Sequence, residues 1–193
     1  MNSEPTLAAP GAGLPALELF IARRLFALKR RFGNRAGFTA QFSKERSAIR
    51  ALIDAIPVAD RDKRVLIPRL RGLEDSSRYW SVWMTLDHLR ITNLVFTGVI
   101  LGLCAGRIPP GKADTASVKP DPSVTGEVEA EYEKSCDKLL SAVSRVAELK
   151  TKLRYEHPWF GPLDAAGWHA LAATHLRIHR AQIEKIRNRL PVS

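Results

Sequence analysis

Apolar side chains recur at intervals of three and four residues along several stretches of the chain, which is the period of an α-helix. The first stretch runs from Leu14 to Phe32, where the sequence "FGNRAG" (32–37) interrupts it, and the pattern then resumes as far as Pro57. Glycine and proline end helical patterns, so this region predicts a broken first helix. We expect the broken helix to pack beside the second helix.

Three further helices follow, and no stretch alternates apolar and polar residues as a strand would. The second helix is expected to start at Asp75, Ser76 or Ser77 and to end at about Ala105. The third should run from Ser123 or Thr125 to Tyr155. The fourth should begin after its cap residue Asp164 and end at about Leu190. Residues 106–126 contain four prolines and three glycines and cannot be helical. The chain is therefore predicted to form an all-α four-helix bundle with a proline-rich loop between its second and third helices.

The size and composition of the chain fit one domain with a single core. The chain has 193 residues, of which 45% are hydrophobic. We expect a flexible N-terminal lead at residues 1–13 and one bundle domain at residues 14–190. The two cysteines form no CxxC pair, the start lacks the positive region of a secretory signal, and the apolar run 94–105 is shorter than the roughly 20 residues of a membrane span. These features favour a cytoplasmic protein without a membrane span.

Positive charge is concentrated near the start of the chain. The net charge is +10, and residues 21–71 hold fourteen Lys and Arg but four acidic residues. Such a block can attract nucleic acid, anionic lipid or an anionic small molecule, and it is also typical of a solvated helix face. Aromatic residues are not interleaved with the basic ones as in single-strand binders, so nucleic acid is not the expected partner.

Two histidines lie on the apolar stripe of the last helix. His175 and His179 are four residues apart, which places both side chains on one face about 5 to 6 Å from each other. His88 lies among apolar neighbours on the second helix and can supply a third nitrogen. Three inward histidines would form a metal site with open positions. The alternative is that they are core histidines without a ligand, because an HxxxH spacing is common.

The other reactive side chains have simpler interpretations. His157 precedes a proline and is expected to order its turn by hydrogen bonding, and His169 is expected at the surface on the opposite side of its helix. Cys136 falls on an inner stripe, where cysteine is usually a small hydrophobic residue. Asp87 and Arg90 point away from His88 by helical phase, so no general base can be named.

Two segments resemble the DinB/YfiT-like family of metal-dependent proteins. They are "YWSVWMTLDHL" (79–89) and "HPWFGPLDAAGWHALAATHLRIHRAQI" (157–183), which cover the second helix, the fourth helix and the turn before it. The resemblance implies a four-helix bundle, often dimeric, that binds nickel, zinc or a similar divalent ion. It places the three metal ligands on His88, His175 and His179.

The resemblance also suggests a reaction. Several similar families transfer low-molecular-weight thiols or isomerise substrates with their help, which implies a metal-dependent thiol S-transferase or thiol-dependent isomerase. A metal-dependent hydrolase, a non-enzymatic metal-stabilised stress-response or binding protein, and nucleic-acid binding through residues 21–71 stay open as alternatives. A homodimer is expected, because "LELFIARRLFAL" (17–28) and "LVFTGVILGL" (94–103) offer more apolar surface than one bundle interior needs.

Overall fold

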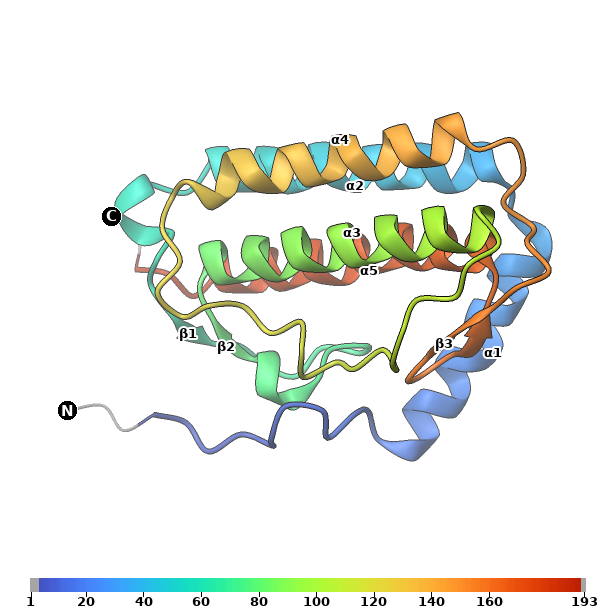
Figure 1. Ribbon diagram of the computed structural model, residues 1–193. Coiled ribbons are helices and arrows are strands. Elements are labelled where there is room, and N and C mark those ends of the chain that lie inside the picture. Colours follow the sequence, from blue (N-terminus) through green and yellow to red (C-terminus); the bar gives the residue numbers. More distant parts are fainter. Residues whose placement is uncertain (1–3, 192–193) are drawn as a thin grey trace.

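The computed structural model describes residues 4–191, and helices dominate this part of the chain (Figure 1). The five helices are α1 (Ala16–Phe32), α2 (Arg35–Asp54), α3 (Val82–Cys104), α4 (Val128–Arg145) and α5 (Ala165–Arg187). The predicted four-helix bundle is confirmed, with the loop of residues 106–126 between α3 and α4. Residues 1–3 of the predicted N-terminal lead lie outside the described part.

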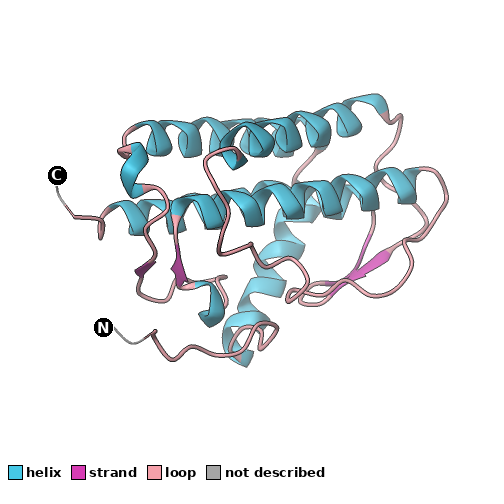
Figure 2. Ribbon diagram, turned by 60° about the vertical axis from the view of Figure 1, so that its left-hand side comes forward, coloured by secondary structure: helices cyan, strands magenta, loops and turns pink. Residues whose placement is uncertain are grey.

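Four helices, α2 to α5, form the bundle in two layers (Figures 1 and 2). One layer contains α2 and α4 and the other contains α3 and α5. Helix α2 packs against α5, and α3 packs against both α4 and α5. The prediction that the broken first helix lies beside the second helix is therefore wrong, because the buried stripe of α2 faces α5.

Helix α1 leaves the bundle at the break. Asn34 caps α2 by accepting a hydrogen bond from the Gly37 N–H at 2.8 Å. A Cβ added at Gly33 would lie 2.3 Å from Cζ of Phe38, so only glycine fits this corner. Beyond it, α1 buries a single residue, Phe26, and leaves Leu17 72% exposed. The apolar stripe of this helix is largely on the surface.

The second predicted helix starts later than expected. Asp75, Ser76 and Ser77 form a short 3-10 helix, and α3 begins after Ser81, whose hydroxyl accepts a hydrogen bond from the Met84 N–H at 3.1 Å. Two short strands lie nearby, β1 (Val65–Leu66) and β2 (Tyr79–Trp80), which pair antiparallel. Through this pairing Trp80 lies close to His88 of α3 and His179 of α5.

The turn before α5 also differs from the prediction. Helix α4 ends at Arg145 instead of Tyr155, and β3 (Tyr155–His157) pairs antiparallel with β4 (Gly161–Leu163). The expectation of a chain without strands is wrong because pairs of two and three residues are too short to show an alternating pattern. Asp164 does cap α5, accepting from the Gly167 N–H at 2.8 Å.

By length and apolar composition, α3 is the one described helix that would suit a membrane span. Its most apolar window is 61% buried inside the bundle, as in the core helix of a folded domain. His88 lies in the first half of α3 and contacts His175 in the middle of α5.

Candidate metal centre

The three predicted ligands come together between α3 and α5. The Nε2 atom of His175 lies 3.1 Å from Nε2 of His88 and 3.1 Å from Nε2 of His179. One nitrogen from each of the three rings falls within 4.8 Å of the other two. Two nitrogens bound to one tetrahedral zinc ion are about 3.4 Å apart, given Zn–N distances of about 2.1 Å. The separations are close to those of a metal site.

Hydrogen bonds on the far side of two rings fix their tautomers. Nδ1 of His88 lies 2.6 Å from the Val118 carbonyl oxygen, which can only accept, so this nitrogen carries the proton. Nδ1 of His179 lies 2.6 Å from Oε1 of Gln182, whose Nε2 donates to the Ser77 carbonyl at 2.7 Å. The amide is thereby oriented, and His179 must donate to it. Both rings present an Nε2 lone pair to His175.

The arrangement suits a cation better than hydrogen bonds alone. A neutral His175 carries one ring proton and cannot make two good hydrogen bonds with it, one to His88 and one to His179. Its Nδ1 is buried and has no hydrogen-bond partner in the described part of the chain. Metal-binding histidines usually present one nitrogen to the ion and donate the proton of the other to an outer partner, a pattern that His88 and His179 fit and that His175 fits only at its Nε2.

Burial keeps the three rings neutral. Desolvation lowers the pKa of His88 from 6.5 to about 4. Desolvation also holds the pKa values of His175 and His179 well below the usual value, and the neighbouring histidines add to the effect. At neutral pH no proton therefore competes with a metal ion for the Nε2 atoms.

Aromatic rings enclose the cluster. The Trp80 ring stacks on His179 with an interplanar angle of 9° and a centroid distance of 6.3 Å, and it lies 5.2 Å from the His88 ring. The Phe96 ring meets His175 edge-on at 5.6 Å. These contacts fix the ring planes and exclude water from their backs.

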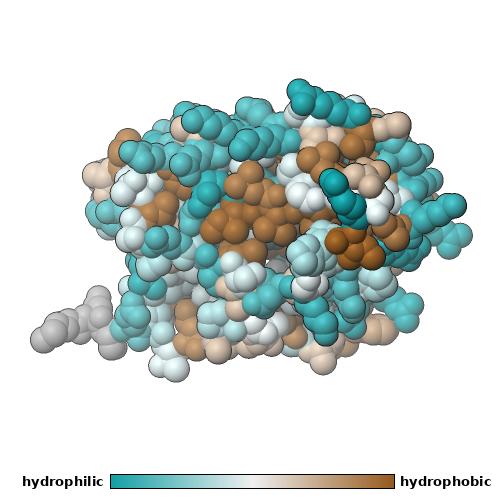
Figure 3. All heavy atoms as spheres, viewed as in Figure 1, coloured by the Kyte–Doolittle hydropathy of each residue, from teal (hydrophilic) through white to brown (hydrophobic). Residues whose placement is uncertain are grey.

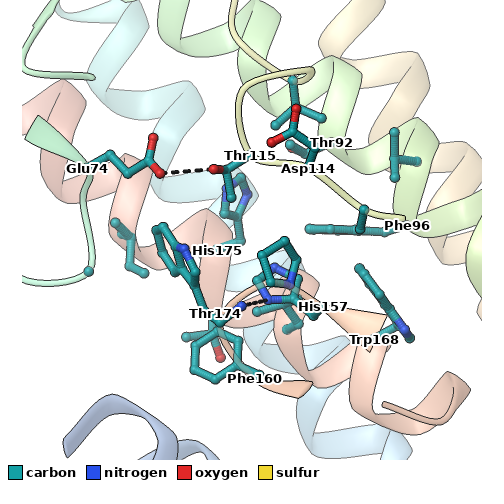
Figure 4. Close-up of a pocket in the computed structure, with 18 of the residues that line it drawn as sticks. Glu74, Thr92, Phe96, Asp114, Thr115, His157, Phe160, Trp168, Thr174 and His175 are labelled. Atoms are coloured by element: carbon teal, nitrogen blue, oxygen red, sulfur yellow. Dashed lines mark hydrogen bonds between the residues drawn. The ribbon is translucent and has the colours of Figure 1, made fainter. Parts of the chain in front are cut away.

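A large cavity opens beside the histidines. It has a volume of about 1280 Å³ and is lined by all three of them and by residues of α1, α3, α5 and the loop 106–126. Figure 4 shows Phe96, His157, Trp168 and His175 around this hollow. Apolar rings such as Phe96 and Trp80 lie against the histidines, which strengthens electrostatic interactions there.

The loop of residues 106–126 is fastened to the cavity rim. Lys119 donates to the carboxylate of Glu74 at 2.7 Å, and the Thr115 hydroxyl donates to the same carboxylate at 2.9 Å (Figure 4). Because the Val118 carbonyl binds His88, this attachment also orients one ring of the cluster. Sequence reasoning did not identify Val118, since a backbone carbonyl leaves no signal in the residue type.

The other two histidines lie apart from the cluster. His157 orders its turn as expected, with Nδ1 accepting from the Trp159 N–H at 3.1 Å, and it also lines the cavity. The surface position predicted for His169 is wrong, because this residue is fully buried against Phe38 and Thr39 of α2. Helix α5 is covered on both sides, so its opposite face is interior as well.

Cys136 and Asp87 take no part in the cluster. Cys136 is fully buried, with the Asn93 side-chain amide donating to its Sγ at 3.4 Å, and burial raises its pKa to about 12, which keeps the thiol protonated and inert. The carboxylate of Asp87 accepts hydrogen bonds from Arg90 and from the Asp121 N–H at 2.9 Å. It therefore holds the last part of the α3–α4 loop, shortly before α4, and faces away from His88, as helical phase predicted.

Comparisons with known proteins support the fold and the family. A search of curated proteins found no match. The chain is similar to the crystal structure of TT2238, a four-helix bundle protein, with a TM-score of 0.58 and 19% sequence identity over 78% of this chain and 98% of the other. The family model of the DinB superfamily matches residues 41–183, which span α2 to α5 and include all three clustered histidines. The chain thus belongs to the DinB superfamily.

Proposed function

We propose that this protein binds a divalent metal ion, nickel or zinc, through His88, His175 and His179 and uses it in thiol chemistry. The observation that carries the proposal is the convergence of three Nε2 atoms, two of them with fixed tautomers, at the wall of a large cavity. Core histidines without a ligand need no such convergence. The reaction class is a thiol S-transferase or a thiol-dependent isomerase.

The chain itself supplies binding, orientation and exclusion of water. His88 and His179 are held by Val118 and Gln182, so their ring nitrogens are preorganised for an ion. When bound, a divalent ion supplies Lewis acidity that lowers the pKa of a thiol or water at an open coordination position. The apolar wall around Phe96 and Trp168 would keep bulk water from a reacting group.

Two metal-based alternatives share the same three ligands. A hydrolase would activate water at the open position, and a binding or stress-response protein would use the ion for stability alone. The size of the cavity favours a reaction with an organic molecule, since a structural ion needs no space beside it. A thiol as the second reactant is supported by the reactions of similar families, which also makes a low-molecular-weight thiol the proposed cofactor.

Nucleic-acid binding is the weaker alternative, because ion pairs already occupy much of the basic segment 21–71. Half of its fourteen Lys and Arg residues pair with carboxylates in the described structure: Arg30, Arg46, Arg50, Arg61, Lys63, Arg64 and Arg69. Several of these pairs join elements far apart in sequence, such as Arg46 of α2 with Glu133 of α4. The charge block therefore serves the fold in large part.

A homodimer remains part of the proposal. Helix α1 exposes an apolar stripe, and α3 adds Leu94, Val95 and Leu101, which are 36%, 39% and 43% exposed. Figure 3 shows an apolar patch over α3 on the face seen in Figure 1. Contiguous apolar surface of this kind usually marks an interface. The cytoplasmic location expected from the sequence stays a prediction.

Cobalt substitution tests the proposed function directly. Untagged protein loaded with Co²⁺ should show ligand-field bands, and a bound thiol should add a thiolate-to-cobalt charge-transfer band. We expect this band with wild-type protein and its absence in His175→Ala. Cobalt bound without any change on adding a panel of small thiols would favour the hydrolase or structural alternatives, and failure to bind Co²⁺, Ni²⁺ or Zn²⁺ would refute the proposal.

A further inference from the structure

The lining of the cavity beside the histidines is rich in cations. Seven Lys and Arg residues line it, compared with three acidic residues. Two of the acids are already used, because Glu18 pairs with Arg69 at 2.5 Å and Glu74 pairs with Lys119 at 2.7 Å. The third, Asp114, accepts hydrogen bonds from backbone N–H groups of its own loop. Several lining cations are thus left without an acidic partner.

Lys29 is the most unusual of these cations. It projects from α1, is half-buried, and donates to the Thr174 hydroxyl at 2.7 Å. That hydroxyl in turn donates to the Ala170 carbonyl at 2.9 Å, so its oxygen is oriented to accept from Lys29. Burial, together with the nearby Arg177 guanidinium, lowers the pKa of Lys29 from 10.5 to about 8. The ammonium group still carries its charge at neutral pH.

Neither Lys29 nor Arg177 forms an ion pair with any described residue. The carboxylate that partly offsets Lys29, Glu45, is itself bound by Arg180 at 2.8 Å. Lys29 is half-buried and Arg177 is exposed, and the two neighbouring charges repel each other unless an anion lies between them. Lys29 and Arg177 therefore do not stabilise the fold as an ion pair would, but together they could bind an anion.

An apolar strip connects this pair of cations to the histidines. On α5, Ile178 lies one turn after Thr174 and directly precedes His179, and it lines the cavity. The rings of Phe26 and Phe160, 4.5 Å apart at their centroids, line it as well. Thr174, which Lys29 contacts, directly precedes His175 on α5, and Lys29, Thr174 and the three histidines all line the same cavity.

We propose that Lys29, held in place by Thr174, and Arg177 bind the anionic end of an amphipathic organic acid whose apolar body lies along Ile178, Phe26 and Phe160. The other end of this molecule reaches the three histidines. The site recognises a terminal carboxylate or phosphate monoester, since both offer oxygen acceptors to a lysine and an arginine. The inference rests on the proposed function only for what happens at the histidine end.

Calorimetric titration of metal-free protein with octanoate, octyl phosphate and 1-octanol tests the anion site separately from the metal. The wild type should bind the better of the two anions at least tenfold more tightly than octanol, which corresponds to about 1.4 kcal/mol. Lys29→Met and Arg177→Met should each remove most of this preference, and comparison of the two anions identifies the end group. Arg24→Met is the matched control, because Arg24 lies on α1 outside the cavity lining.

Stability distinguishes a binding role from a structural one. Removing a half-buried cation that has no ion-pair partner should leave the melting temperature of Lys29→Met unchanged or higher, whereas a structural lysine would lower it. Equal binding of octanoate, octyl phosphate and octanol by the wild type, or full anion preference in both variants, would overturn the proposal. Nickel-loaded protein titrated with 8-mercaptooctanoate then tests the histidine end, and its failure alone would count against the proposed function and leave the anion site standing.

Discussion

The two buried faces of α5 hold histidines in opposite surroundings. On the face toward α3, His175 and His179 meet a third ring, and their nitrogens converge at 3.1 Å beside a cavity. On the face toward α2, His169 meets the Thr39 hydroxyl at 3.3 Å and the edge of Phe38, with ring centroids 6.0 Å apart. The same helix thus carries a candidate metal centre and an isolated core histidine.

This difference shows that burial does not identify a functional histidine. Desolvation lowers the pKa of His169 to about 4, as it does for His88. The cluster is set apart by three other features, which are converging nitrogens, tautomers fixed from behind, and free space in front. His169 has one weak hydrogen bond and no cavity.

The largest effect should come from removing a ligand. His88→Ala, His175→Ala and His179→Ala should each weaken metal binding by roughly 100-fold or more, because even the outer partners of metal ligands contribute 10- to 100-fold. His169→Gln is the control from the other face of α5 and should retain full occupancy. Elemental analysis of untagged protein grown with added nickel and zinc measures this. A metal-free wild type, or a His88→Ala variant with full occupancy, would remove the site.

His169, on the face of α5 that packs against α2, should contribute to the loss of stability at acid pH. Burial, reinforced by the Arg35 guanidinium, lowers the pKa of His169 from 6.5 to about 4 in the folded protein. Between these values His169 carries a proton in the unfolded chain but not in the folded chain, so its contribution to the free energy of unfolding falls as the pH drops from about 6.5 and levels off below about 4.

The matched variant isolates this contribution. His169→Gln cannot titrate, so its loss of stability over the same pH range should be smaller than that of the wild type by up to about 3 kcal/mol. Urea unfolding at a series of pH values measures the difference. Parallel pH profiles for the two proteins would show that His169 does not contribute.

The sequence indicated that His175 and His179 lie close to His88, which the structure shows, but it wrongly placed His169 at the surface. His175, His179 and His88 could be grouped because helical spacing places two of them together and the family resemblance supplies the third. The burial of His169 could not be predicted, because it depends on α2 covering α5, and periodicity within one helix does not reveal which neighbours cover it.

The supporting residues were hidden for a similar reason. Val118 acts through its carbonyl, and Trp80 reaches the cluster from a two-residue strand that no pattern could indicate. The N-cap residue of α5, Asp164, was predicted correctly. The N-cap of α3 was not, because three consecutive polar residues at 75–77 resemble a helix start as much as Ser81 does. The sequence predicted the helix break at Gly33, but it did not predict that α1 would lie outside the bundle with most of its apolar residues exposed.

A smaller effect should come from the residue behind His179. Gln182→Met keeps the length of the side chain but removes the acceptor of the His179 Nδ1 proton, so metal affinity should fall by about 10- to 100-fold without complete loss. Gln41→Met is the matched control, since Gln41 donates to the Ala173 carbonyl from the α2 side at 3.2 Å. Competition with a chelator gives both affinities. Equal affinities for the two variants would mean that Gln182 does not orient the ligand.

The smallest effect should come from the hydrogen bond on the α2 face. Thr39→Val keeps the shape of the side chain and removes the hydroxyl that lies 3.3 Å from Nε2 of His169. A neutral hydrogen bond contributes about 0.5 to 1.5 kcal/mol, and this long one should fall at the lower end. We expect a slightly lower midpoint in urea unfolding and no change in metal content, because the valine lies on the side of α5 opposite the cluster. A Thr39→Val variant that lost metal would show that the two faces of α5 are coupled and that His169 helps to position the candidate ligands.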